Sequence, residues 1–312
     1  MKSAFILALL SLLLFTCRKP IDPVEKPPID SRPKQKNLSK MTVTQPNSDK
    51  VFWIQEWKYD NTNRCTDLIQ KQSFQVNENT PDTFITVAHY RFYYKDIQRD
   101  PYRILQDEDG RPNQLTSEAF LIYTQDGRKV KDSVIYTHPA LGKLLKIGTY
   151  QYNGGVVYYH YQRSSINWTG SLDNITAQKN DTIYVANDNV AEYRKTLFAM
   201  DENRNWIKYV SQYDYTYDNK INPLKQINIA AAMYRIGPDF NYNKWGWLYA
   251  ENDNLSIIGY NGNNITKVTK KAFPQNAQQF SYLYDVDGYP KETTITPLNF
   301  SGTAKATFEY AD

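Results

Sequence analysis

The chain has 312 residues, 37 of them Lys or Arg and 33 Asp or Glu, and its mean hydropathy is -0.67. The basic excess lies near the N-terminus, because residues 51–312 hold 28 basic and 29 acidic side chains. This balance excludes the general basic surface with which proteins bind nucleic acid. The length suffices for one large domain or two smaller ones with a real core.

The N-terminal segment has the pattern of an export signal. Lys2 precedes an apolar run over residues 4–15, which is too short to span a bilayer comfortably. Leu14-Phe15-Thr16-Cys17 follows and resembles a lipobox, the sequence read by the lipoprotein signal peptidase. The resemblance implies removal of residues 1–16 and acylation of Cys17, which would bind the chain to a membrane by lipid. Cys17 is not followed by an Asp, which would suggest retention in the inner membrane, so we expect the lipidated chain in the outer membrane, in either leaflet. The alternative is that the segment is an ordinary secretory signal and Cys17 is there by chance.

Residues 17–50 are predicted to form a tether that begins at the lipidated cysteine. They contain many charges and the prolines Pro20, Pro23, Pro27, Pro28, Pro33 and Pro46. Proline-rich spacers are extended and semi-stiff, so this segment would hold a domain away from the membrane. Its basic residues would favour anionic headgroups, or they simply keep a linker soluble.

From residue 51 onward the sequence predicts β-strands. Aromatic side chains alternate with polar ones at a period of two, which places each set on one face of a sheet. The clearest sets are Trp53, Trp57 and Tyr59; Tyr213, Tyr215 and Tyr217; Phe280, Tyr282 and Tyr284; and Ala304, Ala306, Phe308 and Tyr310.

Turn signals separate these strands. Asx-Gly pairs suit two-residue hairpins because both central residues need positive φ, and they occur at Asp109-Gly110, Asp126-Gly127, Asn153-Gly154, Asn261-Gly262 and Asp287-Gly288. We therefore predict an all-β domain over residues 51–312, an antiparallel meander of hairpins that forms a twisted open or partly closed sheet. A sandwich or propeller-like arrangement is the alternative.

One segment departs from the hairpin pattern. Residues 222–235 contain Ala230, Ala231 and Ala232 and are followed by the helix stop Gly237-Pro238. We predict one short helical insertion near 224–236, between two hairpins.

Several hairpins share a Tyr-Asp step. Tyr59-Asp60, Tyr217-Asp218 and Tyr284-Asp285 each end an aromatic strand and precede a turn with a basic residue. The pattern resembles YD-repeat-like hairpins, and the stretch over residues 215–224 is similar to uncharacterised Bacteroidota cell-envelope lipoproteins. The resemblance covers the C-terminal third best and implies an extracytoplasmic all-β protein of unknown function.

No catalytic, metal or cofactor motif is present in the sequence, so we expect neither an enzyme nor a cofactor. His89 and His160 lie in strand contexts and His138 in a turn, while Cys65 fits a small buried position. The acidic clusters Asp107-Glu108-Asp109 and Asp285/Asp287 are interpreted as turn residues, with a Ca²⁺ site as the less favoured reading.

The aromatic cluster Tyr242, Trp245, Trp247 and Tyr249 is the candidate ligand-binding site. Such rings stack on sugars or anchor protein interfaces, although this spacing also fits a core strand. The sequence thus favours a membrane-anchored lipoprotein, a non-enzymatic binding or scaffold module for a glycan or an envelope protein. The alternative is a polysaccharide hydrolase with paired carboxylates, and a third possibility is a structural spacer.

Overall fold

The structure is a computed structural model. It describes residues 36–44, 47–74, 83–96, 98, 100–108, 115–125, 127–138, 142–166, 172–200, 205–226, 261–297 and 302–311. The chain divides into two units, Met1–Gln35 and Lys36–Asp312, of which only the second is described.

The second unit is built from sixteen strands. In chain order they are β1 (Asn37–Thr44), β2 (Val51–Tyr59), β3 (Cys65–Phe74), β4 (Thr83–Tyr93), β5 (Arg103–Glu108), β6 (Leu115–Tyr123), β7 (Lys129–His138), β8 (Gly142–Asn153), β9 (Val156–Ile166), β10 (Leu172–Ala186), β11 (Asn189–Met200), β12 (Trp206–Ile221), β13 (Asn263–Lys270), β14 (Gln278–Tyr284), β15 (Pro290–Pro297) and β16 (Ala304–Ala311). A single 3₁₀ turn, η1 (Pro274–Asn276), interrupts the connection from β13 to β14.

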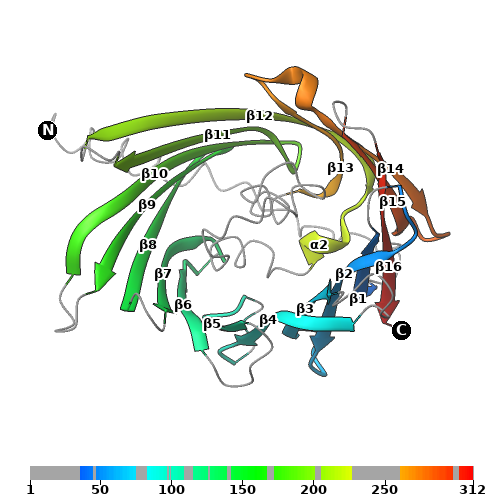
Figure 1. Cartoon of the computed structure of the whole chain (residues 1–312), viewed down its shortest axis with the longest axis horizontal. Helices are drawn as coiled ribbons and strands as arrows, with labels where there is room; N and C mark the ends of the chain where they lie inside the picture. The colour runs from blue at the N-terminus through cyan, green and yellow to red at the C-terminus, as the bar shows by residue number, and fades with distance from the viewer. Residues whose placement is uncertain are drawn as a thin grey trace, which may run out of the picture. The chain divides into compact units, whose positions relative to one another are not determined.

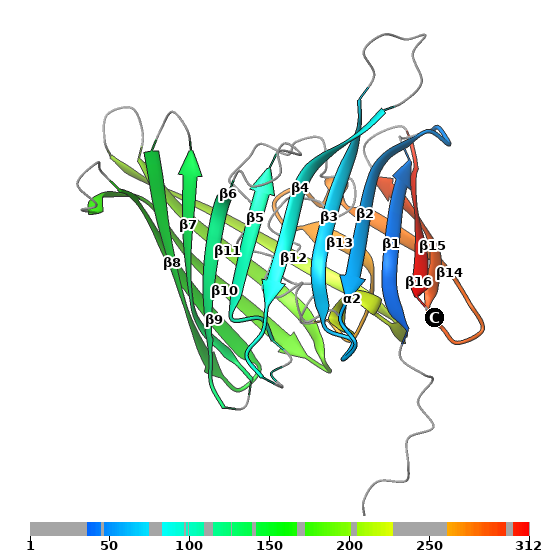
Figure 2. The same ribbon diagram turned by 90° about the horizontal axis from the view of Figure 1, so that it is seen from below.

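The strands form one closed barrel (Figures 1 and 2). Each strand pairs antiparallel with the next in sequence, and β1 pairs with β16 from Asn37↔Ala311 to Val43↔Ala306. The antiparallel hairpins agree with the turn signals, but the predicted open or partly closed sheet is wrong. Hairpin patterns specify neighbours along the chain, whereas closure depends on strand number, tilt and shear, which no local pattern encodes.

β1 lies within the 17–50 segment that the sequence predicts to be a tether. Leu38, Met41 and Val43 are buried and pack in the core, while Lys40 and Thr42 point the other way. The prolines and charges around this strand hide its alternation. The folded unit therefore starts about where β1 does, and not at residue 51.

The predicted helical insertion is also corrected. Its described part is a single four-residue turn, α2 (Pro223–Gln226), and residues 227–260 lie outside the described residues. Figure 1 shows α2 on the inner side of the ring of strands, where Leu224 packs against the core. Among the described residues, no helix has the length and hydropathy needed to cross a membrane.

Each strand presents one face to the interior of the barrel and one to the outside. Along β16, for example, Ala304 and Ala306 are fully buried while Lys305 and Glu309 are exposed. The concave side of a curved sheet brings side chains together and the convex side spreads them apart, so we assign the buried set to the inner face. The inner face is aromatic and aliphatic, as the sequence alternation predicts.

Three tight turns have the same hydrogen-bonding pattern. They lie at the end of the barrel where β1 begins and β16 ends. They join β2 to β3, β6 to β7 and β14 to β15, and begin at Asp60, Thr124 and Asp285. In each, the first residue exchanges two backbone hydrogen bonds with the turn, and a side-chain oxygen of that residue accepts from the backbone N–H four residues on. The fourth position has positive φ: Asn63 at 60°, Gly127 at 80° and Gly288 at 84°.

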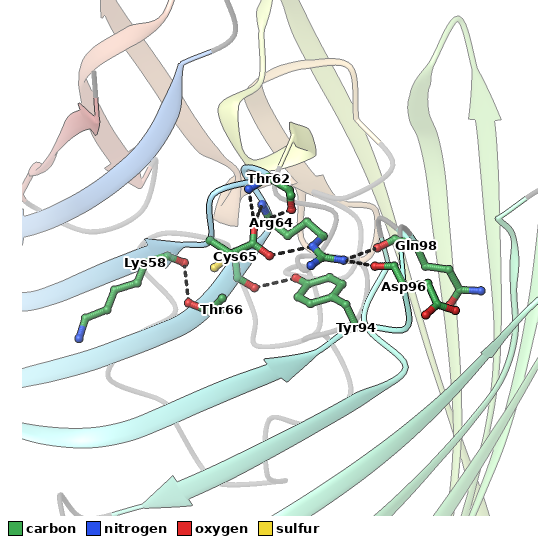
Figure 3. A network of polar contacts seen from close by, with 9 residues as sticks. Lys58, Thr62, Arg64, Cys65, Thr66, Tyr94, Asp96 and Gln98 are labelled. Atoms are coloured by element: carbon green, nitrogen blue, oxygen red, sulfur yellow. Dashed lines mark hydrogen bonds and ion pairs between the residues drawn. The ribbon is translucent and has the colours of Figure 1, made fainter.

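Figure 3 shows the surroundings of the first of these turns. Arg64 donates from Nε to Asp60 Oδ2 (2.8 Å) and from Nη1 to the Asp96 carbonyl (2.6 Å), and it lies over the Tyr94 ring. Desolvation alone would raise the pKa of Asp60, but hydrogen bonds from Thr62 and Arg64 outweigh it and hold that pKa below its usual value. In the Tyr59-Asp60 and Tyr284-Asp285 steps the Asp is thus the residue that caps the turn. The third step differs, because Asp218 lies within β12 and is not followed by a turn of this kind.

The tyrosines form a second recurring feature, which we call the tyrosine clasp. Toward this same end, six odd-numbered strands diverge from the even-numbered strands that follow them, and a tyrosine hydroxyl on the even-strand side donates to a backbone carbonyl across the gap. In each case the tyrosine lies three residues after the even-strand member of the last register pair. The carbonyl belongs to the residue two positions before the odd-strand member of that pair. The clasps are Tyr59–Leu38, Tyr94–Cys65, Tyr152–Lys129, Tyr217–Val190, Tyr282–Ile265 and Tyr310–Pro290, with O···O distances of 2.6 to 2.9 Å.

Candidate functional site

The inner face of the barrel is lined by stacked aromatic rings. Tyr150 lies 5.1 Å from Tyr159, and Tyr159 lies 5.8 Å from Tyr161, measured between ring centroids. Tyr193 and Tyr213 stack in the same way on β11 and β12. These ring pairs bury large apolar areas, and the hydroxyls of Tyr150 and Tyr193 donate to carboxylates, so the inner face combines hydrophobic packing with hydrogen bonding.

Buried charges accompany these rings on β7 to β11. The Tyr150 hydroxyl donates to Asp132 (2.8 Å), and Lys129 Nζ lies 3.8 Å from the same carboxylate oxygen and 4.8 Å from the Tyr150 ring centroid. Farther round, the Tyr193 hydroxyl donates to Asp181 (2.7 Å). Buried carboxylates need such partners, because an unpaired charge in the interior is very costly.

A second lysine extends this cluster. Lys146 is buried on β8 and its Nζ lies 4.6 Å from the Tyr161 ring centroid. Cation–π contacts of this kind strengthen when they are removed from water. We call Lys129, Asp132, Lys146, Asp181 and their tyrosines the inner polar cluster. No sequence pattern marks this cluster, because the tyrosine partners of Asp132 and Asp181 come from other strands.

The outer face carries paired charges over most of the wall. Five of the six pairs join neighbouring strands, while Lys271, just after β13, reaches past β12 to Glu192 on β11. Their side chains are partly exposed, except that of Asp107, which is buried. They are Lys40–Glu309, Glu56–Lys71, Arg91–Asp107, Arg103–Glu118, Lys271–Glu192 and Lys305–Glu292, with N···O distances of 2.6 to 3.9 Å.

The two histidines predicted to lie in strands do so, in β4 and β9, and both are on this outer face. His89 contacts Asp67 (2.8 Å) across β3 and β4, and His160 Nδ1 contacts Asn180 Oδ1 across β9 and β10 (2.5 Å). Cys65 is buried, as predicted, and burial raises the pKa of its thiol. This thiol is therefore a packing group rather than a nucleophile.

The two predicted acidic turn clusters have different outcomes. Asp285 and Asp287 lie in the β14–β15 turn, as expected. Asp107 instead lies within β5, where Arg91 pairs with it, and Asp109 is outside the described residues. Within the described ranges, no group of three or more His, Cys, Asp or Glu side chains is placed to hold a metal ion.

The first described residue is fastened to the β14–β15 turn. Lys36 Nζ lies 2.7 Å from Asp285 and 2.6 Å from Asp287, and the Lys36 backbone N–H donates to the Tyr289 hydroxyl (3.3 Å). Hydrogen bonds to both carboxylates raise the pKa of Lys36. The start of the folded unit is thus fixed to a turn that lies beyond the neighbouring strand β16.

The residues predicted for lipidation and ligand binding lie outside the described residues. This applies to Cys17 and to Tyr242, Trp245, Trp247 and Tyr249. Both assignments stay predictions from the sequence.

Comparison with known proteins supports the fold only. No protein-family model matches the chain, and no curated protein resembles it in sequence. Among solved structures, a porin-like protein from Bacteroides vulgatus ATCC 8482 superposes with a TM-score of 0.50 at 10% identity, covering 88% of this chain and 99% of that one. A porin-like protein from Bacteroides uniformis ATCC 8492 gives a TM-score of 0.48 at 11% identity, covering 88% and 98%. The chain therefore has a porin-like barrel fold.

Proposed function

We propose that this chain is a cell-envelope lipoprotein, held at the outer membrane by lipid on Cys17, whose barrel stands in water as a non-enzymatic binding or scaffold module. The observation that carries the proposal is the charge on the outer face of the barrel wall. A barrel that crosses a membrane needs an outward apolar band. The outer wall here carries ion pairs between strands, interspersed with exposed apolar side chains such as Ile122 and Val210, rather than a continuous apolar band.

Four basic side chains lie near the middle of their strands. Lys40, Lys71, Arg194 and Lys267 lie at least three residues from either end of their strands. A Lys or Arg facing lipid at the bilayer midplane costs about 2–4 kcal/mol. Four of them would cost on the order of 10 kcal/mol, which is comparable to the whole stability of a typical domain.

Strand length points the same way. A membrane-spanning strand needs about 9–11 residues. β5 has 6 residues, β14 has 7, and β1, β13, β15 and β16 have 8 each. This part of the wall is short for a bilayer.

The competing proposal is that the barrel itself crosses the outer membrane as a porin. It is favoured by the even number of antiparallel strands in a closed barrel whose first and last strands have their free ends on one side. The two proposals differ in what holds the protein at the membrane, which gives a direct test.

The test compares the full-length chain with its Cys17→Ala variant in a Gram-negative host. We expect the unsubstituted chain in the membrane fraction and the variant in the soluble periplasmic fraction, with the same circular dichroism spectrum and no conductance in planar bilayers. A variant that stays in membranes after alkaline carbonate washing, or that forms channels, would overturn the proposal.

The ligand is tested with the soluble Cys17→Ala chain on an array of envelope glycans, with crosslinking in the envelope as the test for a protein partner. Trp245→Ala and Trp247→Ala probe the site that the sequence predicts, and the exposed Tyr158→Ala is the matched aromatic control. Loss of binding in the tryptophan variants alone would support a carbohydrate module. Shortened glycans among the products would favour the hydrolase.

A further inference from the structure

The barrel wall has one weak seam. β13 and β14 pair through only two residue pairs, Lys267↔Gln279 and Val268↔Gln278. Every other adjacent pair of strands has at least four register pairs among the described residues, and β8 with β9 has eleven. We propose that the barrel opens along the β13–β14 seam, and that this opening is a lateral entry to the inner face. This inference is independent of the proposed anchoring and ligand.

Both strands at the seam are held firmly on their other sides. β14 makes seven register pairs with β15, and β13 makes six with β12. Separating β13 from β14 therefore leaves each strand in its own part of the sheet. All sixteen strands would remain one continuous sheet, which now has two edges, because β1 and β16 stay joined by six pairs.

Side chains complete the closure where the backbone does not. The Tyr282 hydroxyl donates to the Ile265 carbonyl across the seam (2.9 Å), and the Tyr284 hydroxyl contacts Asp218 on β12 and Asn264 on β13. The rings of Tyr282 and Tyr284 stack at 5.9 Å. Because sub-global openings occur where few hydrogen bonds must break, this seam is the place in the wall where opening is least costly.

Opening would expose inner residues that are otherwise shielded. Val268 lies on the inner face at the seam and is 2% exposed, and Val157 on β9 is 4% exposed beside the seam with the most register pairs. The two positions are therefore matched in residue type and burial but differ in the strength of the adjacent seam.

The experiment measures labelling of a thiol at each position with N-ethylmaleimide. Val268→Cys and Val157→Cys are placed singly in the full-length chain carrying Cys17→Ala and Cys65→Ala. We expect Val268→Cys to react at least tenfold faster, at a rate almost independent of low urea concentrations, while labelling of Val157→Cys follows global unfolding. Equal rates, or equal dependence on urea, would overturn the proposal.

A second comparison tests the clasp at the seam. Tyr282→Phe removes one of the bonds that hold it, so we expect labelling of Val268→Cys to rise several-fold. Tyr152→Phe removes the equivalent clasp from the β7–β8 seam, which has eight register pairs, and should leave that rate unchanged. The same effect from both variants would show that they act through overall stability and would count against a seam.

Hydrogen exchange on the chain with native β13 and β14 avoids any effect of the substitutions. Peptides covering residues 263–270 and 278–284 should exchange faster than peptides covering residues 142–166. Uniform protection around the barrel would contradict the lateral entry even if the cysteine variants failed to fold.

Discussion

Single tyrosine hydroxyls close gaps in the backbone pairing of this barrel. The Tyr59 hydroxyl is the partner of the Leu38 carbonyl at 2.6 Å, where β1 and β2 diverge. A net hydrogen bond of this kind contributes about 0.5–1.5 kcal/mol. We expect Tyr59→Phe to lower the free energy of unfolding by about 1 kcal/mol, measured by urea denaturation. Tyr158→Phe on the exposed outer face is the control and should change stability by less than about 0.5 kcal/mol.

The same tyrosines predict how the protein responds to alkali. Burial is the main cause that raises the pKa of Tyr59, Tyr94, Tyr217 and Tyr310 well above the usual 10. A raised pKa means that the folded state retains its proton where the unfolded state has lost it. The stabilisation is complete below about pH 10 and is lost as the pH rises above it.

Together these four side chains should reduce stability by about 5 kcal/mol per pH unit above pH 10, since each contributes about 1.4. We expect a cooperative alkaline transition in circular dichroism that coincides with the appearance of tyrosinate absorbance. Gradual titration of tyrosinate in a barrel that stays folded would contradict the assignment of these residues to buried clasps.

At the scale of the element, the three five-residue turns each depend on one residue with a left-handed backbone. Gly288 has φ of 84° in the β14–β15 turn, and the equivalent position in the β2–β3 turn is Asn63 with φ of 60°. A left-handed backbone costs an ordinary residue roughly 1–2 kcal/mol, while Gly and Asn adopt it readily.

Gly288→Ala should therefore lower stability by about 1 kcal/mol, and Gly288→Asn by less than half as much. Chemical denaturation of the two variants checks the difference. If both substitutions cost the same, the loss would arise from packing rather than from backbone conformation.

The same elements show what could be predicted from the sequence. The period-two alternation placed Trp53 and Trp57 on one face, and likewise Tyr213, Tyr215 and Tyr217, and the structure confirms it. Asn153-Gly154 and Asp287-Gly288 are turns, as predicted, but Asn187-Asp188 is also a turn with both φ values positive and was missed because it lacks glycine. Asn261-Gly262 leads into β13 instead of forming a hairpin turn, and Asn261 is buried and accepts from the Val190 backbone N–H and the Tyr217 hydroxyl.

The inner polar cluster could not be predicted for a different reason. Asp132 and Asp181 look like ordinary surface carboxylates in a polar chain, and their tyrosine partners come from other strands. Their burial follows from closure of the sheet, which also decides that the charged face is the outer one. The predicted site at residues 242–249 lies outside the described residues, and so it is neither confirmed nor corrected.

At the scale of the whole molecule, one non-local pairing turns a meander into a barrel. The pairing of β1 with β16 joins the first and last strands of the barrel, and their register pairs include Met41↔Phe308 and Val43↔Ala306. A chain without β1 would leave β2 and β16 as unpaired edges flanking the apolar inner face. Exposed edges of this kind pair with other molecules.

This gives a prediction about where the domain begins. A chain starting at Lys36 keeps β1 and the Lys36 contacts with Asp285 and Asp287, and we expect it to be monomeric with one cooperative thermal transition. A chain starting at residue 51, the boundary that the sequence pattern indicates, should associate or precipitate as its edges pair between molecules. Light scattering with size-exclusion chromatography distinguishes the two. A monomeric, cooperatively folding 51–312 chain would mean that the remaining fifteen strands close without β1, and that the β1–β16 pairing is dispensable rather than the step that completes the barrel.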